Sequence, residues 1–136
     1  MEMNELLGDF YRLQFRSNRL YEEYAKSVGE NAQTLYFLQL VSNASTPLCQ
    51  RDLCESLSIP KQTMSRMLKQ MQDRGIVEIS PSSADRRENV VSLTEEGASF
   101  ANGLIAELSR IEGECVKAVG KEAIEQVSAT TRKFFD

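Results

Sequence analysis

The chain of 136 residues contains no histidine and no tryptophan, and it has only three cysteines and three prolines. Without histidine, the protein lacks the commonest general base and the commonest metal ligand. The sequence also has no glycine-rich phosphate loop, no Ser-His or Cys-His arrangement and no cluster of carboxylates in a turn. These absences argue against an enzyme. They also argue against a zinc site, because three scattered cysteines form a poor one, and we expect no cofactor.

Long apolar runs are absent as well. No run is long enough to cross a bilayer and no signal peptide is recognisable, so we expect a cytoplasmic protein that does not contact a membrane. In that compartment disulfides are not expected to hold the fold together.

Charge is distributed unevenly along the chain. The whole sequence carries 16 Lys and Arg against 20 Asp and Glu, for a net charge of -4. Residues 58–87, however, hold six basic and three acidic residues, a net of +3, whereas the rest holds ten basic and 17 acidic residues, a net of -7. Because binding to phosphates needs local cations, this basic segment on an acidic body favours a nucleic-acid contact through one small surface.

The segment 60–73 has the pattern of a two-sided helix. Apolar residues recur at steps of three and four, which predicts one buried face made of Met64, Met67, Leu68 and Met71. The opposite face is polar and cationic and consists of Gln62, Ser65, Arg66 and Lys69. Pro60 suits the first position of this helix, and Gly75 suits its end. Such a face can donate hydrogen bonds to phosphates and base edges.

The neighbouring segments complete a compact module. A short helix is expected over 49–57, with Leu53 and Leu57 facing inward, followed by a turn at 58–60. After Gly75, the β-branched stretches 76–79 and 89–93 flank a polar loop that contains Arg86 and Arg87, and together they predict a hairpin. A helix followed by an arginine-tipped hairpin can occupy a major groove and the neighbouring minor groove of one duplex.

Amphipathic helices are expected on both sides of this module. Before and within the start of the module, one helix is expected to reach about Val28 and a second to cover Ala32–Val41. After the hairpin, a third helix is expected from Thr94 to about Gly120, and a last one carries Ile124, Val127, Phe134 and Phe135. We expect a mainly α fold with a β wing: a single domain over 1–136, in which 31–97 form a winged helix-turn-helix and 1–30 and 98–136 form helices for dimerisation. The alternative is that these apolar seams close within one chain and leave a monomer.

Several motifs at matching spacing resemble the multiple-antibiotic-resistance regulator (MarR) family of bacterial transcription factors. They include 50–53, 59–66, Asp73-Arg74-Gly75-Ile76-Val77, and above all Asp85-Arg86-Arg87 followed by Leu93-Thr94-Glu95-Glu96-Gly97. The similarity covers about residues 35–104. Two positions depart from the family pattern: Ile79 stands where a basic residue is usual, and Ser58 where glycine is frequent.

The resemblance implies a homodimer that binds a pseudo-palindromic operator in double-stranded DNA and acts as a repressor or activator. The recognition helix would be 61–69, with Lys61, Gln62, Thr63, Ser65, Arg66 and Lys69 as its DNA-binding residues. On the wing, Arg86 would enter the minor groove, Asp85 would orient the loop, and Arg87 would touch phosphate or brace the loop. Which of Arg86 and Arg87 enters the minor groove stays open.

The resemblance also implies release from DNA by a small ligand or by oxidation of a cysteine. The candidate effector pocket comprises Arg16, Tyr36, Phe37 and Phe100, which suggests a small aromatic or anionic ligand; the alternative is that these aromatics are ordinary core. Cys49, at a helix start beside Arg51, is the candidate redox sensor, and a plain substitution is the alternative. Cys54 is expected in the core, and Cys115 in the core or a dimer interface.

One competing function remains open at this point. A winged helix can bind protein and not DNA, and its outward helix face would then carry exposed aromatic residues or leucines as anchors. The polar residues predicted on the outward face here favour DNA.

Overall fold

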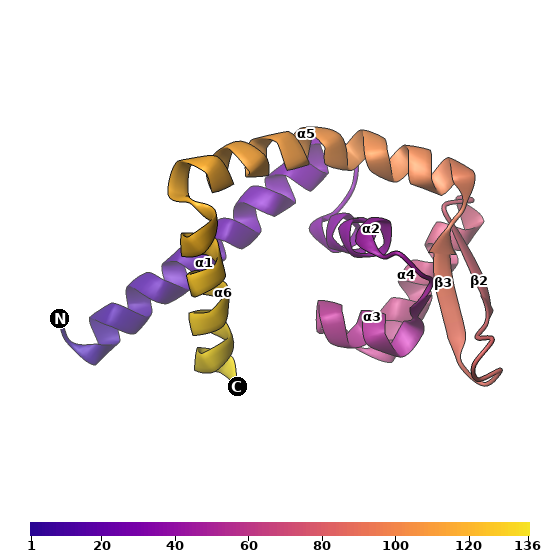
Figure 1. Ribbon diagram of the computed structural model, residues 1–136, viewed down its shortest axis with the longest axis horizontal. Helices are drawn as coiled ribbons and strands as arrows, with labels where there is room; N and C mark the ends of the chain where they lie inside the picture. The colour runs from indigo at the N-terminus through magenta and orange to yellow at the C-terminus, as the bar shows by residue number, and fades with distance from the viewer. The chain divides into compact units, whose positions relative to one another are not determined.

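The computed structural model describes all residues, 1–136, and consists of six helices and three short strands (Figure 1). The order along the chain is α1 (Met3–Ser27), α2 (Ala32–Asn43), β1 (Leu48–Cys49), α3 (Gln50–Leu57), α4 (Lys61–Asp73), β2 (Val77–Pro81), β3 (Asn89–Leu93), α5 (Glu95–Val119) and α6 (Lys121–Phe135). The chain divides into two compact units, Met1–Asn102 and Gly103–Asp136. The expected mainly α fold with a small antiparallel sheet is confirmed.

The first unit contains the winged helix-turn-helix. Helix α2 packs against α3 and β3, and α4 packs against α3 and β2. The face of α4 formed by Met64, Met67, Leu68 and Met71 is buried, as its spacing predicts. It lies in a core whose other fully buried side chains include Leu35, Phe37, Leu38, Leu53 and Val91. Burial of one stripe of α4 therefore fixes which stripe faces outward.

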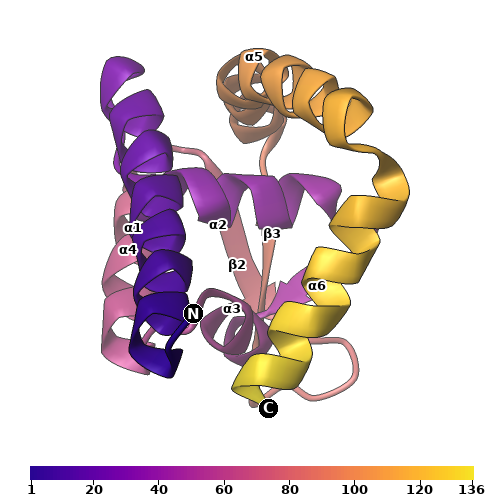
Figure 2. The same ribbon diagram turned by 90° about the vertical axis from the view of Figure 1, so that its left-hand side faces the viewer.

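Strands β2 and β3 lie side by side in Figures 1 and 2 and pair antiparallel, with Val77 opposite Leu93 and Pro81 opposite Asn89. The sheet order is β1-β3-β2, because Leu48 and Cys49 pair with Val91 and Val90 at the other edge of β3. Sequence patterns missed β1, since two residues are too short for any periodicity. They also began the second strand one residue early, because Ile76 closes α4 through a hydrogen bond from its N–H to the Met71 carbonyl (2.9 Å).

Helices α1, α3 and α4 end in the same way. In each, a residue with positive φ follows the last turn: Gly29 (φ 79°), Ser58 (φ 51°) and Gly75 (φ 73°). The next N–H returns to a carbonyl five residues earlier, as from Glu30 to Ala25 (2.8 Å) and from Ile59 to Cys54 (3.1 Å). This is the Schellman arrangement, in which a left-handed residue satisfies the free carbonyls of the last turn. At the turn after α3, Ser58 therefore adopts the conformation that glycine takes without strain.

Replacing Ser58 with glycine is expected to stabilise the protein. A side chain costs roughly 1–2 kcal/mol in the left-handed region, and glycine gives back part of that gain through its larger unfolded-state entropy. The expected net gain is about 0.5–1 kcal/mol, or a rise of a few degrees in Tm by calorimetry at fixed protein concentration. The matched control is Ser56→Gly, within the last turn of α3, which should destabilise by a similar amount. An unchanged or lower Tm for Ser58→Gly would contradict this account.

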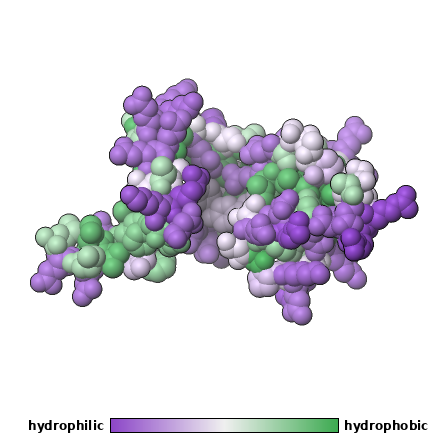
Figure 3. All heavy atoms as spheres, turned by 60° about the horizontal axis from the view of Figure 1, so that its bottom comes forward, coloured by the Kyte–Doolittle hydropathy of each residue, from purple (hydrophilic) through white to green (hydrophobic).

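Apolar side chains are exposed along α1. Leu6, Leu13 and Leu20 are each more than half exposed and recur every seven residues, so they form a stripe along the helix. Figure 3 shows hydrophobic atoms spread over the left-hand end of the molecule, where Figure 1 places the N-terminal part of α1.

The second unit consists of α5 from Gly103 onward and the whole of α6. Its exposed apolar side chains are Ile111, Val116, Val119, Ile124, Val127, Phe134 and Phe135. Gly120 separates the two helices with a φ of 92°, as the sequence indicates. No helix of the structure combines the length and the apolar composition needed to cross a membrane.

Candidate nucleic-acid interface

Helix α4 presents a polar face to solvent. Gln62, Ser65, Arg66 and Lys69 are all exposed, as is Lys61 at the first turn, and Thr63 is half-buried at the edge of this face. Arg66 and Lys69 make no ion pair, so both cations are available to a ligand. No acidic residue interrupts the face until Asp73, at the end of the helix. The predicted separation of an apolar and a cationic face is therefore present in the structure.

Helix α4 is tied to α3 on this same surface. The Gln50 side-chain amide donates a hydrogen bond to the Ser65 hydroxyl (3.2 Å). Because Gln50 opens α3, this bond joins the start of one helix to the exposed face of the next. Ser65 is thus held by a neighbour and remains exposed to solvent.

The loop 82–88 is closed by its own hydrogen bonds. The Ser82 N–H donates to the Glu88 carbonyl (2.8 Å), and the Glu88 N–H donates to the Asp85 carbonyl (3.0 Å). The Ser82 hydroxyl accepts a hydrogen bond from the Ala84 N–H (3.2 Å). Short polar side chains therefore satisfy backbone donors that a hairpin of this length leaves unpaired.

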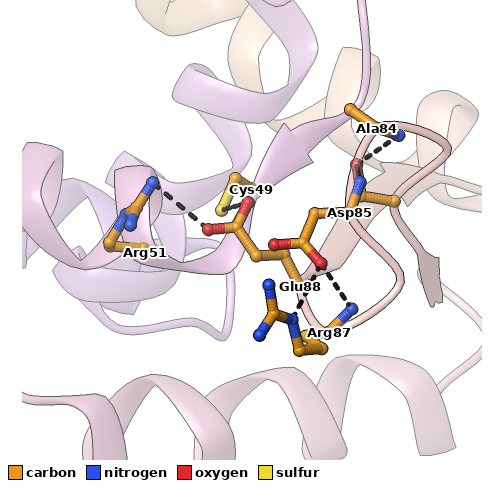
Figure 4. Close-up of polar contacts among 7 residues, drawn as sticks. Cys49, Arg51, Ala84, Asp85, Arg87 and Glu88 are labelled. Carbon is orange, nitrogen blue, oxygen red and sulfur yellow. Dashed lines mark hydrogen bonds and ion pairs between the residues drawn. The ribbon is translucent and has the colours of Figure 1, made fainter.

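Asp85 orders the second half of the loop. Its carboxylate accepts a hydrogen bond from the Arg87 N–H (3.0 Å) and lies 3.4 Å from the Arg87 Nε (Figure 4). Ile79, on the strand where the family pattern has a basic residue, cannot supply such a partner. Arg87, two residues along the loop, is the cation that pairs with Asp85 instead.

The two adjacent arginines differ in their contacts. Arg87 is paired with Asp85, although its side chain is 92% exposed. Arg86 is exposed and makes no hydrogen bond or ion pair within the chain. The structure therefore distinguishes a braced arginine, Arg87, from an unpaired one, Arg86, at the end of the hairpin.

Glu88 connects the base of the wing to the start of α3. One carboxylate oxygen lies 3.2 Å from the Arg51 guanidinium, and the other accepts a hydrogen bond from the Cys49 thiol (3.6 Å). Figure 4 shows both contacts meeting at the Glu88 carboxylate. Sequence reasoning missed this contact, because 39 residues separate Cys49 from Glu88. Arg51 therefore pairs with Glu88, and the Cys49 thiol has the same carboxylate as its hydrogen-bonding partner.

A hollow of about 340 Å³ opens at this junction. Its lining comes from α3, the first residue of α4 and the base of the wing, and consists of Cys49, Gln50, Arg51, Cys54, Lys61, Arg87, Glu88 and Asn89. Three cations against one acid make the lining electropositive. Cys49 and Cys54 are half-buried here, whereas Cys115 is exposed in the second unit.

The residues proposed for an effector pocket have different surroundings. Arg16 is exposed on α1, and Phe37 is fully buried in the core. Tyr36 is half-buried against Tyr21, with ring centroids 5.6 Å apart. Burial is the larger cause, and the negative charge of Glu22 the smaller one, that raises the pKa of the Tyr36 hydroxyl. Phe100 lies under the Arg74 guanidinium at 5.1 Å. Tyr36 also lines a hollow of about 340 Å³ with residues of α2 and α3.

Comparison with known proteins agrees with this architecture. Residues 30–88 match the family model of the MarR family. Over 59 residues, 43% of the chain, the sequence is 30% identical to an HTH-type transcriptional repressor, NicR, of Pseudomonas putida, and the match spans 37% of the length of that relative.

Solved structures extend the likeness to the whole chain. The S. aureus protein MepR in its DNA-binding conformation superposes with a TM-score of 0.81 at 16% identity, covering 99% of this chain and 97% of that one. A MarR family regulator from Neisseria meningitidis gives a TM-score of 0.81 at 22% identity, covering 98% and 92%. Residues 30–88 therefore resemble the MarR family in sequence, and the chain from end to end shares the fold of these solved structures.

Proposed function

We propose that this protein is a transcriptional regulator that binds specific sites in double-stranded DNA as a homodimer. Helix α4 would enter the major groove, and Arg86 on the wing would enter the adjacent minor groove. The observation that carries the proposal is the exposed face of α4, on which Arg66 and Lys69 make no ion pair, in the same module as an unpaired wing arginine.

Electrostatics supports DNA as the ligand. Segment 58–87 is net positive within an acidic chain, so attraction to phosphate is confined to one surface. The hollow lined by Arg51, Lys61 and Arg87 continues that positive surface from α4 to the wing. A protein partner would instead favour aromatic or leucine anchors, and the outward face of α4 has none.

The exposed apolar stripe of α1 supports a homodimer. Leu6, Leu13 and Leu20 are each more than half exposed, and a stripe with seven-residue spacing is typical of helices that pack against another helix. A second copy supplies an identical stripe, so a twofold interface would cover both. The two α4 helices would then face successive major grooves, about one helical turn apart.

The relatives favour repression as the direction of control. The matched P. putida protein is named a transcriptional repressor, and one of the similar solved structures is a complex of MepR with DNA, at a TM-score of 0.73. Operator binding that blocks transcription is the simplest function consistent with both.

We also propose that DNA binding is regulated, either by a small aromatic or anionic ligand near Arg16, Tyr36, Phe37 and Phe100, or by oxidation of Cys49. The Cys49 thiol donates to Glu88, which also holds Arg51 at the base of the wing. Because a sulfur in a disulfide carries no proton, oxidation of Cys49 to a disulfide would remove one of the two side-chain contacts of Glu88.

Selection of DNA from a random duplex library tests the function. We expect enrichment of a pseudo-palindrome, two chains per duplex by analytical ultracentrifugation, and an affinity that falls steeply as salt rises. Competition with unrelated duplex of the same length is the control. Failure to enrich any sequence, or affinity that does not depend on salt, would contradict the proposal and favour a protein partner.

A further inference from the structure

Another ion pair lies outside the proposed DNA-binding face, at the C-terminal end of α4. The Arg74 guanidinium donates two hydrogen bonds to the two carboxylate oxygens of Glu30, at 2.6 and 3.2 Å. This forked geometry is the strongest arrangement that arginine and a carboxylate form. The Glu30 side chain is only 10% exposed and that of Arg74 is 42% exposed, so solvent screens this pair less than it screens the other ion pairs of the chain.

Glu30 and Arg74 each lie at a helix end that is closed by a backbone hydrogen bond. Glu30 is the residue after Gly29, and its N–H closes the end of α1 on the Ala25 carbonyl (2.8 Å). Arg74 is the last residue before Gly75, and the Ile76 N–H closes the end of α4 on the Met71 carbonyl (2.9 Å). Each helix therefore ends in a Schellman closure, and the ion pair links the two closures directly.

A third helix contributes an aromatic ring. The Arg74 guanidinium lies over the Phe100 ring in the second turn of α5, with 5.1 Å to the centroid. An arginine can bind a carboxylate with its edge and an aromatic ring with its face at the same time. The hydrogen bond to Glu30, opposed by burial and aided by charge attraction, raises the pKa of Arg74, so the guanidinium stays charged.

We propose that Arg74 is a positioning residue for DNA recognition: held by Glu30 and Phe100, it fixes the direction of α4 relative to α1 and the start of α5. This inference rests on the proposed DNA-binding function. Because α1 carries the stripe assigned to the dimer interface, the link would set the angle at which each copy presents its recognition helix to a shared operator.

For the variant Glu30→Gln, the proposal and a purely electrostatic account predict opposite changes in DNA affinity. Glu30→Gln removes a negative charge, which by charge alone should leave DNA affinity unchanged or strengthen it. Loss of the forked pair should instead weaken operator binding, roughly fivefold, because α4 would sample directions that do not fit the groove. Arg74→Gln should weaken it to a similar extent.

The salt dependence separates positioning from direct contact. If Arg74 touched a phosphate, its removal would lower the log-log slope of affinity against salt by about one unit. A positioning residue leaves that slope unchanged while the affinity falls. Glu55→Gln is the matched control, since Glu55 is an exposed acid on α3 outside any ion pair, and it should not weaken binding.

The closing experiment measures operator binding by wild type, Glu30→Gln, Arg74→Gln and the double variant, each below its own unfolding transition. We expect equal losses in both single variants, no further loss in the double variant, and an unchanged salt slope. Additive losses, a lower slope for Arg74→Gln, or tighter binding by Glu30→Gln would overturn the positioning role and leave the proposed function intact. Absence of specific DNA binding by the wild type would overturn the function and this inference with it.

Discussion

Arg66→Ala is expected to lower operator affinity by about 10- to 100-fold, because a bidentate arginine contact to a guanine contributes roughly 1–3 kcal/mol of discrimination. The Arg66 side chain is exposed and makes no ion pair, so its removal should leave the unfolding transition unchanged. The loss should be largest for the cognate sequence and small for unrelated duplex, since a base contact reads sequence. Fluorescence anisotropy with both duplexes measures the two affinities under the same salt conditions.

Lys26→Ala is the matched control for Arg66→Ala. It removes the same charge from the same unit, but Lys26 lies in the last turn of α1, outside the proposed DNA-binding face. We expect a loss of at most about twofold from the change in net charge. Equal losses in the two variants would mean that Arg66 acts only through overall charge, and would contradict its assignment to a base or phosphate.

Arg86→Ala provides a comparison within the wing. Because Arg87 is already held by Asp85 and Arg86 is not, removing Arg86 should reduce binding more than removing Arg87. A larger effect of Arg87→Ala would reverse the roles of the two residues.

The faces of α4 could be predicted from sequence because they depend on local spacing alone. Met64, Met67, Leu68 and Met71 repeat with the period of a helix, and burial of that stripe determines that Arg66 faces solvent. The positive φ at Gly29 and Gly75 follows the same logic, since the chain must turn where each helix ends. Helix faces and helix ends can be predicted from sequence because each depends on residues that are close together in the chain.

The contacts around the wing and at the end of α4 could not be predicted in this way. Glu88 meets Cys49 across 39 positions and Arg74 meets Glu30 across 44, and no periodicity links residues so far apart. Strand β1 is defined by its partner β3, not by its own two residues. Long-range pairs of this kind become visible only when the fold brings the segments together.

The Leu-Thr-x-x-Gly motif at 93–97 illustrates the same limit. The sequence places the start of α5 at Thr94, and the Thr94 hydroxyl accepts a hydrogen bond from the Gly97 N–H (2.9 Å). The structure adds that this hydroxyl donates to the Gly75 carbonyl (2.5 Å), while the Thr94 N–H donates to the Ile76 carbonyl (3.0 Å). The first turn of α5 is therefore pressed against the backbone that follows α4, and the glycine of the motif lies at that contact.

Gly97→Ala is expected to destabilise the protein by about 3 kcal/mol, the upper end for inserting a methyl group into a packed site. A Cβ at Gly97 would lie 1.9 Å from the Ile76 carbonyl oxygen and 2.7 Å from its carbon, and backbone atoms cannot move aside as a flexible side chain can. Helix propensity alone predicts the opposite, a gain of about 1 kcal/mol. At fixed protein concentration, Tm should fall by about 10 °C.

Gly103→Ala is the matched control for this change, because Gly103 lies in the same helix and a Cβ there would meet nothing within 4 Å. The higher helix propensity of alanine should then determine the change in stability, and Tm should rise by a few degrees. If both variants gained stability, the close approach of α5 to Ile76 would not exist in solution. A loss at Gly97 with a gain at Gly103 would locate the requirement for glycine in the contact with the backbone after α4, and not in the helix itself.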